Sequence, residues 1–278
     1  MEKRYEKKVL EKGTTIYGDH TNPPIPEGYN YVFGSWNGGY TIVNCLGDAF
    51  VWVPIGALEK NGVFKGKLEK FGRRPSLDKP FVESGYYEEN SKELEEQFEM
   101  VKKYGGIYIS KNLISKTPRN EVHSYVERFP WVNISIDEAR AVIKEAFETE
   151  KVGAGVVTAS LYDSILELLI ELGVKNTDEI VKDSSSWGNF AELPYVKDPK
   201  PKLEMTGVHP ENRVIGINDL AGNVGELTLE SNTFTKTKAT VRGGGYGHCD
   251  NYANVAFRSQ VSSSGHSAVG FRAVLFIK

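Results

Sequence analysis

The segment Ile217-Asn218-Asp219-Leu220-Ala221-Gly222-Asn223-Val224-Gly225-Glu226-Leu227 carries the most structural information in this chain. In a helix, the carboxylates of Asp219 and Glu226 would be about 10 Å apart, too far to share an ion. The Gly222-Asn223 turn between them lets the chain wrap back, so both acids and the intervening carbonyls can surround one centre. Hard oxygen ligands in that arrangement suit calcium. The alternative is a metal-free turn in which Glu226 accepts backbone N–H bonds.

Three further motifs lie on either side of this turn. Phe50-Val51-Trp52-Val53-Pro54 predicts a buried strand that ends at proline, because proline cannot donate to a sheet ladder. The run Phe129-Pro130-Trp131-Val132-Asn133-Ile134-Ser135 leads into a helix with a capping box at Ser135. The third motif is Val241-Arg242-Gly243-Gly244-Gly245-Tyr246, followed later by Val269-Gly270-Phe271-Arg272.

The distribution of elements predicts an α+β fold rich in irregular loops. Helices are expected in the middle of the chain, the first capped by Asn90 with Glu93 and stopped at Gly105, the last running from about Ser160 to Leu172. Strands at both ends are expected to pair with one another. We divide the chain into an N-terminal arm with a short hairpin, residues 1–48, and one domain, residues 49–278. At least two of the four tryptophans should be core residues.

Composition excludes several classes of function. The 278 residues carry a net charge of −3, which argues against a dedicated nucleic-acid binder. No apolar run is long enough to insert into a membrane. Residues 2–12 mix both charge signs without an apolar stretch, so no secretory signal is expected and the cytoplasm or a phage particle is the predicted location. Two distant cysteines permit at most one disulfide. Oligomeric state has no signature here.

Together the four motifs resemble the formylglycine-generating-enzyme (sulfatase-modifying factor) family, a branch of the C-type-lectin fold. The resemblance covers roughly residues 49–278 and is closer to a clostridial or phage-type, non-catalytic subgroup through residues 25–29, 103–109 and 183–189. It implies a structural calcium held by the side chains of Asp219 and Glu226 and the carbonyls of Gly222 and Val224. The family has Trp where Gly225 and Leu227 stand, so the stacking surface of two rings is lost, which argues against a ligand site built on them.

The same resemblance argues against catalysis. Two cysteines bind copper in catalytic members, and their positions fall on His248 and Ala253 in this chain. Cys249 is displaced by one residue, which in an extended strand points to the opposite face. A lone thiolate cannot supply the pair that holds monovalent copper. No redox cofactor is therefore expected. A metal-dependent oxidoreductase of the formylglycine-generating or sulfoxide-synthase type, using His248 and His266, is the alternative.

The segment from Tyr246 to Ser267 is instead rich in residues suited to recognition. Tyrosine gives a large rigid contact area and small polar residues give adaptable hydrogen bonds. This composition resembles the variable segment of diversity-generating-retroelement target proteins, which share the lectin fold; an ordinary polar loop is the competing interpretation. The predicted function is binding of a protein or glycan on a cell or partner surface, with Val255 and Phe257 as anchors. The predicted ligand-binding residues are Tyr246, His248, Asp250, Asn251, Tyr252, Asn254, Arg258, Ser259, Ser263 and His266.

Overall fold

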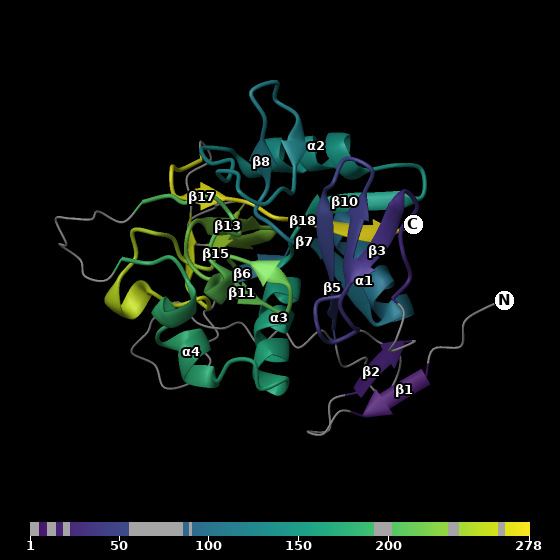
Figure 1. Ribbon diagram of the computed structural model, residues 1–278, viewed down its shortest axis with the longest axis horizontal. Coiled ribbons are helices and arrows are strands. Elements are labelled where there is room, and N and C mark those ends of the chain that lie inside the picture. The colour runs from purple at the N-terminus through teal and green to yellow at the C-terminus, as the bar shows by residue number, and fades with distance from the viewer. Residues whose placement is uncertain are drawn as a thin grey trace.

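The computed structural model describes residues 6–9, 15–18, 23–55, 86–88, 91–191, 202–232, 239–260 and 265–278. These residues form a large antiparallel sheet and a smaller mixed sheet, with the longer helices packed against them (Figure 1). The fold is mixed α and β with short, irregular strands, as predicted. None of the helices in the described part of the chain has the length and apolar character needed to cross a membrane.

The large sheet has the strand order β10-β18-β7-β5-β4-β3, with every neighbouring pair antiparallel. The strand predicted at residues 50–54 is confirmed as part of β5. The C-terminal strand β18 pairs with β10 and β7, and β7 separates it from β5. In this sheet β5 and β18 are both neighbours of β7 and do not pair with each other. The expected pairing of strands from the two ends is found elsewhere, where β6 (Tyr86–Glu88), which precedes the helices, pairs with β14 (Glu230–Asn232), which follows them. The strands are β3 (Tyr29–Phe33), β4 (Thr41–Asn44), β5 (Ala49–Pro54), β7 (Gly106–Ser110), β10 (Val152–Val156) and β18 (Ala273–Ile277).

The predicted boundary between residues 48 and 49 falls inside this sheet. Strand β4 pairs with β5, with Val43 opposite Ala49 and Ile42 opposite Phe50. Strand β3 in turn pairs with β4. The hairpin of β3 and β4 is thus an integral edge of the large sheet and not part of a separate arm.

Local sequence signals place most helix ends. Ser91, and not the predicted Asn90, caps α1, where its hydroxyl accepts a bond from the Leu94 amide; Gly105 ends the helix at φ 79°. Ser135 caps α2 as predicted, accepting from the Glu138 amide. Thr158 caps α3, so this helix begins slightly before the predicted position. The helices are α1 (Lys92–Tyr104), α2 (Ile136–Phe147), α3 (Ala159–Glu171) and the short α4 (Thr177–Val181).

The smaller sheet has the order β16-β15-β13-β17, in which only β13 and β17 run parallel. Its strands are β13 (Gly225–Thr228), β15 (Thr240–Arg242), β16 (Arg258–Gln260) and β17 (Val269–Gly270). Two-stranded ribbons and 3-10 turns complete the described residues: β1 (Glu6–Val9) with β2 (Thr15–Gly18), β6 (Tyr86–Glu88) with β14 (Glu230–Asn232), β8 (Ser115–Lys116) with β9 (Val122–His123), β11 (Arg213–Val214) with β12 (Ile217–Asn218), and η1 (Ser185–Trp187), η2 (Pro210–Asn212) and η3 (Asp250–Tyr252).

The apolar core covers the large sheet and continues through Leu227 and Val241 of the smaller sheet. Trp52 is fully buried and makes edge-to-face contacts with Trp36 and Tyr108, each with 5.1 Å between ring centroids. Phe50 makes similar contacts with Tyr29 and Phe147. Edge-to-face pairs add about 0.5–1.5 kcal/mol each beyond area burial. Three of the four tryptophans, including Trp187, are buried, which confirms that at least two belong to the core.

Candidate functional site

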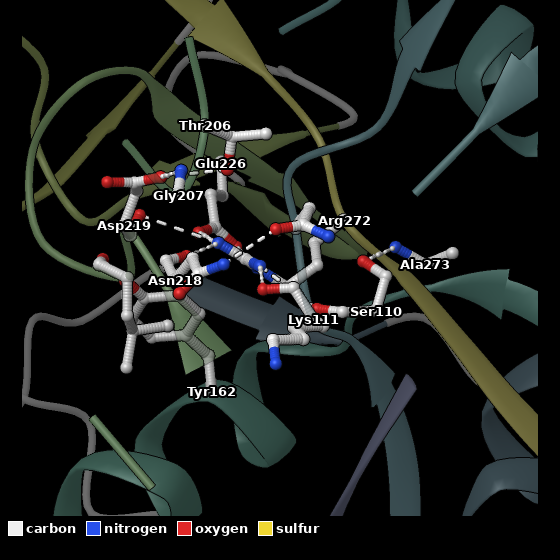
Figure 2. A network of polar contacts seen from close by, with 12 residues as sticks. Ser110, Lys111, Tyr162, Thr206, Gly207, Asn218, Asp219, Glu226, Arg272 and Ala273 are labelled. Carbon is white, nitrogen blue, oxygen red and sulfur yellow. Dashed lines mark hydrogen bonds and ion pairs between the residues drawn. The ribbon is translucent and has the colours of Figure 1, made fainter. Parts of the chain in front are cut away.

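Arg272 is the centre of the polar network around the Asp219–Glu226 turn (Figure 2). Its Nη2 donates to Glu226 Oε1 at 2.8 Å, and its Nε lies 3.2 and 3.1 Å from the two carboxylate oxygens. Its remaining donors reach the backbone carbonyls of Ser110, Lys111 and Asn218 at 3.0, 3.2 and 2.9 Å. Because these acceptors come from the end of β7, from β12 and from β13, one guanidinium joins both sheets.

Asp219 is held by different partners. It is 3% exposed and adopts φ 52°, a left-handed conformation that few residues other than glycine take. Its Oδ2 accepts the Thr206 hydroxyl at 2.8 Å and the Gly207 amide at 2.7 Å. The turn therefore fixes the segment around residue 206 through Asp219, and the β7 end through Arg272.

This geometry does not fit the predicted calcium. Both oxygens of Glu226 face the guanidinium of Arg272, so a cation shared by Glu226 and Asp219 would have to displace a buried positive charge. Without Glu226, the predicted set of calcium ligands is reduced to one carboxylate, that of Asp219, and the carbonyls of Gly222 and Val224. Within the described residues, no group of three or more His, Cys, Asp or Glu side chains could hold a metal ion. The metal-free alternative, in which Glu226 accepts hydrogen bonds from backbone N–H groups, also differs from the structure. The donor to the Glu226 carboxylate is the Arg272 guanidinium.

A row of buried charges crosses the smaller sheet. Glu226, Arg242 and Arg258 are directly opposite one another on β13, β15 and β16, and all three are fully buried. Asp163 of α3 bridges the two arginines, at 2.6 Å from Arg242 Nη2 and 3.4 Å from Arg258 Nη2. Glu230 completes the network with an ion pair of 2.7 Å to Arg258. Sequence analysis missed Asp163, whose signal was an acid on the otherwise apolar face of its helix.

Arg242 depends on its charged neighbours more than on hydrogen bonds. Its contact with Asp163 has the distance of an ion pair but not the angles of a hydrogen bond, and its guanidinium stands over the Tyr162 ring at 5.0 Å. Burial lowers the pKa of Arg242, but Asp163 and Glu230 outweigh that effect and the pKa is raised. The Tyr162 hydroxyl donates to the Leu220 carbonyl at 3.0 Å, and burial raises its pKa well above the usual range.

The predicted ligand-binding residues divide between the surface and the interior. Arg258 is fully buried and Asn254 is 2% exposed, so both are corrected to structural positions. Arg258 faces Asp163 and Glu230, and strand alternation sends its neighbour Ser259 outward. Ser263 and the side chain of Asn251 lie outside the described residues. The residues that do reach the surface are Tyr246, His248, Asp250, Tyr252, Ser259 and His266, which we call the C-terminal surface.

An aromatic cluster anchors this surface. The Tyr252 side chain is 53% exposed, yet its ring packs edge-on against Phe257 at 5.6 Å. The ring centroid of His248 lies 4.6 Å from that of Phe257 and 6.4 Å from that of Tyr252. Phe257 and Val255 are buried beneath, as predicted. The exposed ring of Tyr252 is thus presented on a packed support.

The two late histidines are held by backbone amides. His248 Nδ1 accepts the Gly245 amide at 3.1 Å, and His266 Nδ1 accepts the Ala268 amide at 3.1 Å. Burial, and then the charge of His266, lower the pKa of His248, so its neutral form is favoured. Burial and the neighbouring Asp250 raise the pKa of the Cys249 thiol, which favours the uncharged thiol.

The fold and this site define a mixed α and β domain of the C-type-lectin type. Residues 173–277 match the model of the sulfatase-modifying factor enzyme 1-like domain, which is the family that the sequence motifs resemble. The matched region contains the turn, the buried arginines and the C-terminal surface. The family match does not extend over residues 49–172, which form the first half of the predicted domain.

Other comparisons give more distant likenesses. A search of curated proteins found no match to this chain. Among solved structures, the crystal structure of CarF is 13% identical with a TM-score of 0.45, and the alignment covers 71% of this chain and 95% of CarF. Treponema denticola variable protein 1 is 14% identical with a TM-score of 0.26, with 97% of this chain and 98% of that protein covered.

Proposed function

We propose that this protein binds a protein or glycan ligand through its C-terminal surface and does not transform it. The observation that carries the proposal is the aromatic cluster of Tyr252, His248 and Phe257, which presents a half-exposed tyrosine ring on a buried support. Rigid, partly exposed tyrosines are typical anchors of binding surfaces because they give large contact area at small entropic cost.

The polar residues around Tyr252 supply the remaining recognition chemistry. Asp250 and His266 are exposed, and Ser259 is partly exposed beside the inward-facing Arg258. The ion pairs of Arg258 with Asp163 and Glu230 fix the strand that carries Ser259. A surface held from below in this way loses little conformational freedom when a ligand binds.

The thiol chemistry of this region also supports binding over catalysis. The positions that resemble the family's two copper-binding cysteines hold His248 and Ala253. The remaining thiol, Cys249, has a raised pKa, whereas both nucleophilic attack and metal ligation need the thiolate. We therefore assign the surface a recognition role.

A glycan and protein array probed with the full chain tests this proposal. We expect Tyr252→Ala to weaken the strongest signal at least tenfold and His266→Ala to weaken it less. Tyr31→Ala is the matched control, because Tyr31 is 49% exposed but lies on β3 of the other sheet. Equal binding by wild type and Tyr252→Ala, with both folded by circular dichroism, would show that the ligand binds elsewhere.

A further inference from the structure

A separate cavity lies on the large sheet, outside the C-terminal surface. Its volume is about 480 Å³, within the range of about 300–1,000 Å³ common for small-molecule sites. One wall is the face of β3, β4 and β5 that carries Phe33, Thr41, Val43 and Ala49, and the opposite wall is the segment 124–128. Lys111, the residue after β7, also lines it.

The wall opposite the sheet is fixed in place. Ser124 donates from its amide to Asp48 Oδ1 at 2.8 Å and from its hydroxyl to the Ala49 carbonyl at 3.0 Å. The Glu127 amide donates to the Thr206 carbonyl at 2.8 Å. Glu127 itself adopts φ 58°, a strained conformation for a non-glycine residue that these bonds must maintain. These bonds hold the segment 124–128 in place beside the sheet.

Lys111 is a cationic group of this cavity that has no ion-pair partner among the described residues. Its Nζ stands 4.5 Å from the centroid of the Phe33 ring, and no carboxylate of the described residues is within ion-pair distance of it. Burial, and then the charge of Arg213, lower the pKa of Lys111. Arg128 lines the same cavity and adds a second positive charge, while Glu127 contributes one negative charge. The Lys111 ammonium is thus partly desolvated, and no carboxylate of the described residues is close enough to pair with it.

We propose that this cavity binds a small organic carboxylate with an apolar body. The carboxylate pairs with Lys111, where a desolvated ammonium makes a stronger ion pair than one in bulk water. The apolar body lies between Phe33 and Val43 on the sheet and Val126 on the opposite wall. The site is independent of the C-terminal surface, since no residue is shared between them.

Nuclear magnetic resonance titration of the ¹⁵N-labelled full chain with benzoate tests this proposal. We expect saturable shifts of the amides of residues 124–128, and at least tenfold weaker binding of the neutral analogue benzamide. Lys111→Met keeps the aliphatic stem and should weaken benzoate binding at least tenfold, whereas Lys111→Arg should retain it. Lys116→Met is the matched control, because Lys116 Nζ also stands over an aromatic ring, Trp131, at 4.3 Å but outside the cavity.

Several outcomes would overturn the proposal. One is the absence of saturable shifts at the cavity, and another is equal binding of benzoate and benzamide. A third is an equal loss of affinity in Lys111→Met and Lys116→Met. If Lys111→Met fails to fold, Phe33→Ala serves instead: its side chain is 46% exposed, so the change removes the apolar contact at small cost to stability, and unchanged benzoate affinity in this variant contradicts the site.

Discussion

The two sheets of this protein are held by different chemistry. The large sheet packs through apolar and aromatic contacts, with Trp52 between Trp36 and Tyr108. The smaller sheet faces α3 through a layer of buried charge, in which three guanidinium groups balance three carboxylates with none more than 2% exposed: Arg242, Arg258, Arg272, Asp163, Glu226 and Glu230. The C-terminal surface is built on this second, charged layer.

The difference matters because the two kinds of core respond differently to change. Apolar contacts are non-directional, so a core of this kind tolerates changes of shape when volume is kept. A buried ion pair is directional, and loss of one partner leaves an uncompensated charge in a medium that solvates it poorly. The charged layer therefore fixes the orientation of the strands beneath the C-terminal surface, at the cost of sensitivity to single substitutions.

The largest effect is expected for Arg272→Met. This change removes the guanidinium that joins both sheets and leaves Glu226 buried without a counter-charge, so we expect a loss of about 5 kcal/mol in the free energy of unfolding at pH 7, the upper end for broken buried pairs. The double variant Glu226→Leu/Arg272→Met removes both charges and should be more stable than Arg272→Met alone. Urea denaturation measures both. Glu226→Leu alone completes the double-mutant cycle, and a double variant whose loss equals the sum of the two single losses would contradict the pairing.

The same variant should acquire a characteristic pH dependence. Burial raises the pKa of Glu226 and Arg272 opposes the rise, so without Arg272 the pKa rises further. A carboxyl with a raised folded-state pKa contributes stability that is present below the unfolded pKa of about 4.3 and is lost as pH rises through the folded pKa. Arg272→Met should therefore destabilise the protein more at pH 8 than at pH 5. The double variant should lack this extra dependence.

Asp163→Asn should produce the next largest loss. The change preserves shape but removes the charge that contacts both Arg242 and Arg258, so we expect a loss of about 3 kcal/mol, the lower end for a broken buried pair because Glu230 still neutralises Arg258. The control is Leu166→Met, a volume-conserving change at a fully buried position of the same helix, which should cost less than about 1.5 kcal/mol. If Leu166→Met lost more free energy of unfolding than Asp163→Asn in the same denaturation experiment, the charged layer would not be the more sensitive of the two cores.

The apolar layer predicts a smaller effect for Phe50→Leu. Leucine fills most of the space but loses the edge-to-face contacts with Tyr29 and Phe147, at 5.7 and 5.3 Å between ring centroids. We expect a loss of about 1–2 kcal/mol that is the same at pH 5 and pH 8, because the contacts involve no charge. Thermal unfolding at both pH values measures it. If the loss of unfolding free energy in Phe50→Leu changed with pH, a titratable group would have to interact with this apolar core.

How far the sequence predicts this structure depends on the range of each interaction. The Ser135 cap and the β5 strand follow from residues within one turn or one strand, and both were predicted. The partner of Glu226 was not, because Arg272 lies 46 residues further along the chain. Arg258 was assigned to the surface from the polar composition of its neighbours. Its buried charge is compensated by Glu230 and Asp163, which lie 28 and 95 residues earlier, and no local pattern carries that information.

The smallest expected effect concerns His248, at the boundary between the charged layer and the C-terminal surface. Its pKa is lowered by burial and by His266, so the unfolded chain binds a proton more readily than the folded one. The stability this contributes is complete above about pH 6.5 and is lost as pH falls toward the folded pKa. Melting temperatures between pH 7.5 and pH 5 should therefore decline less in His248→Gln than in wild type. His266→Gln should give an intermediate decline, because it removes the charge of His266 but leaves the burial of His248. If melting temperatures declined as much in His248→Gln as in wild type, another group would be responsible for the pH dependence.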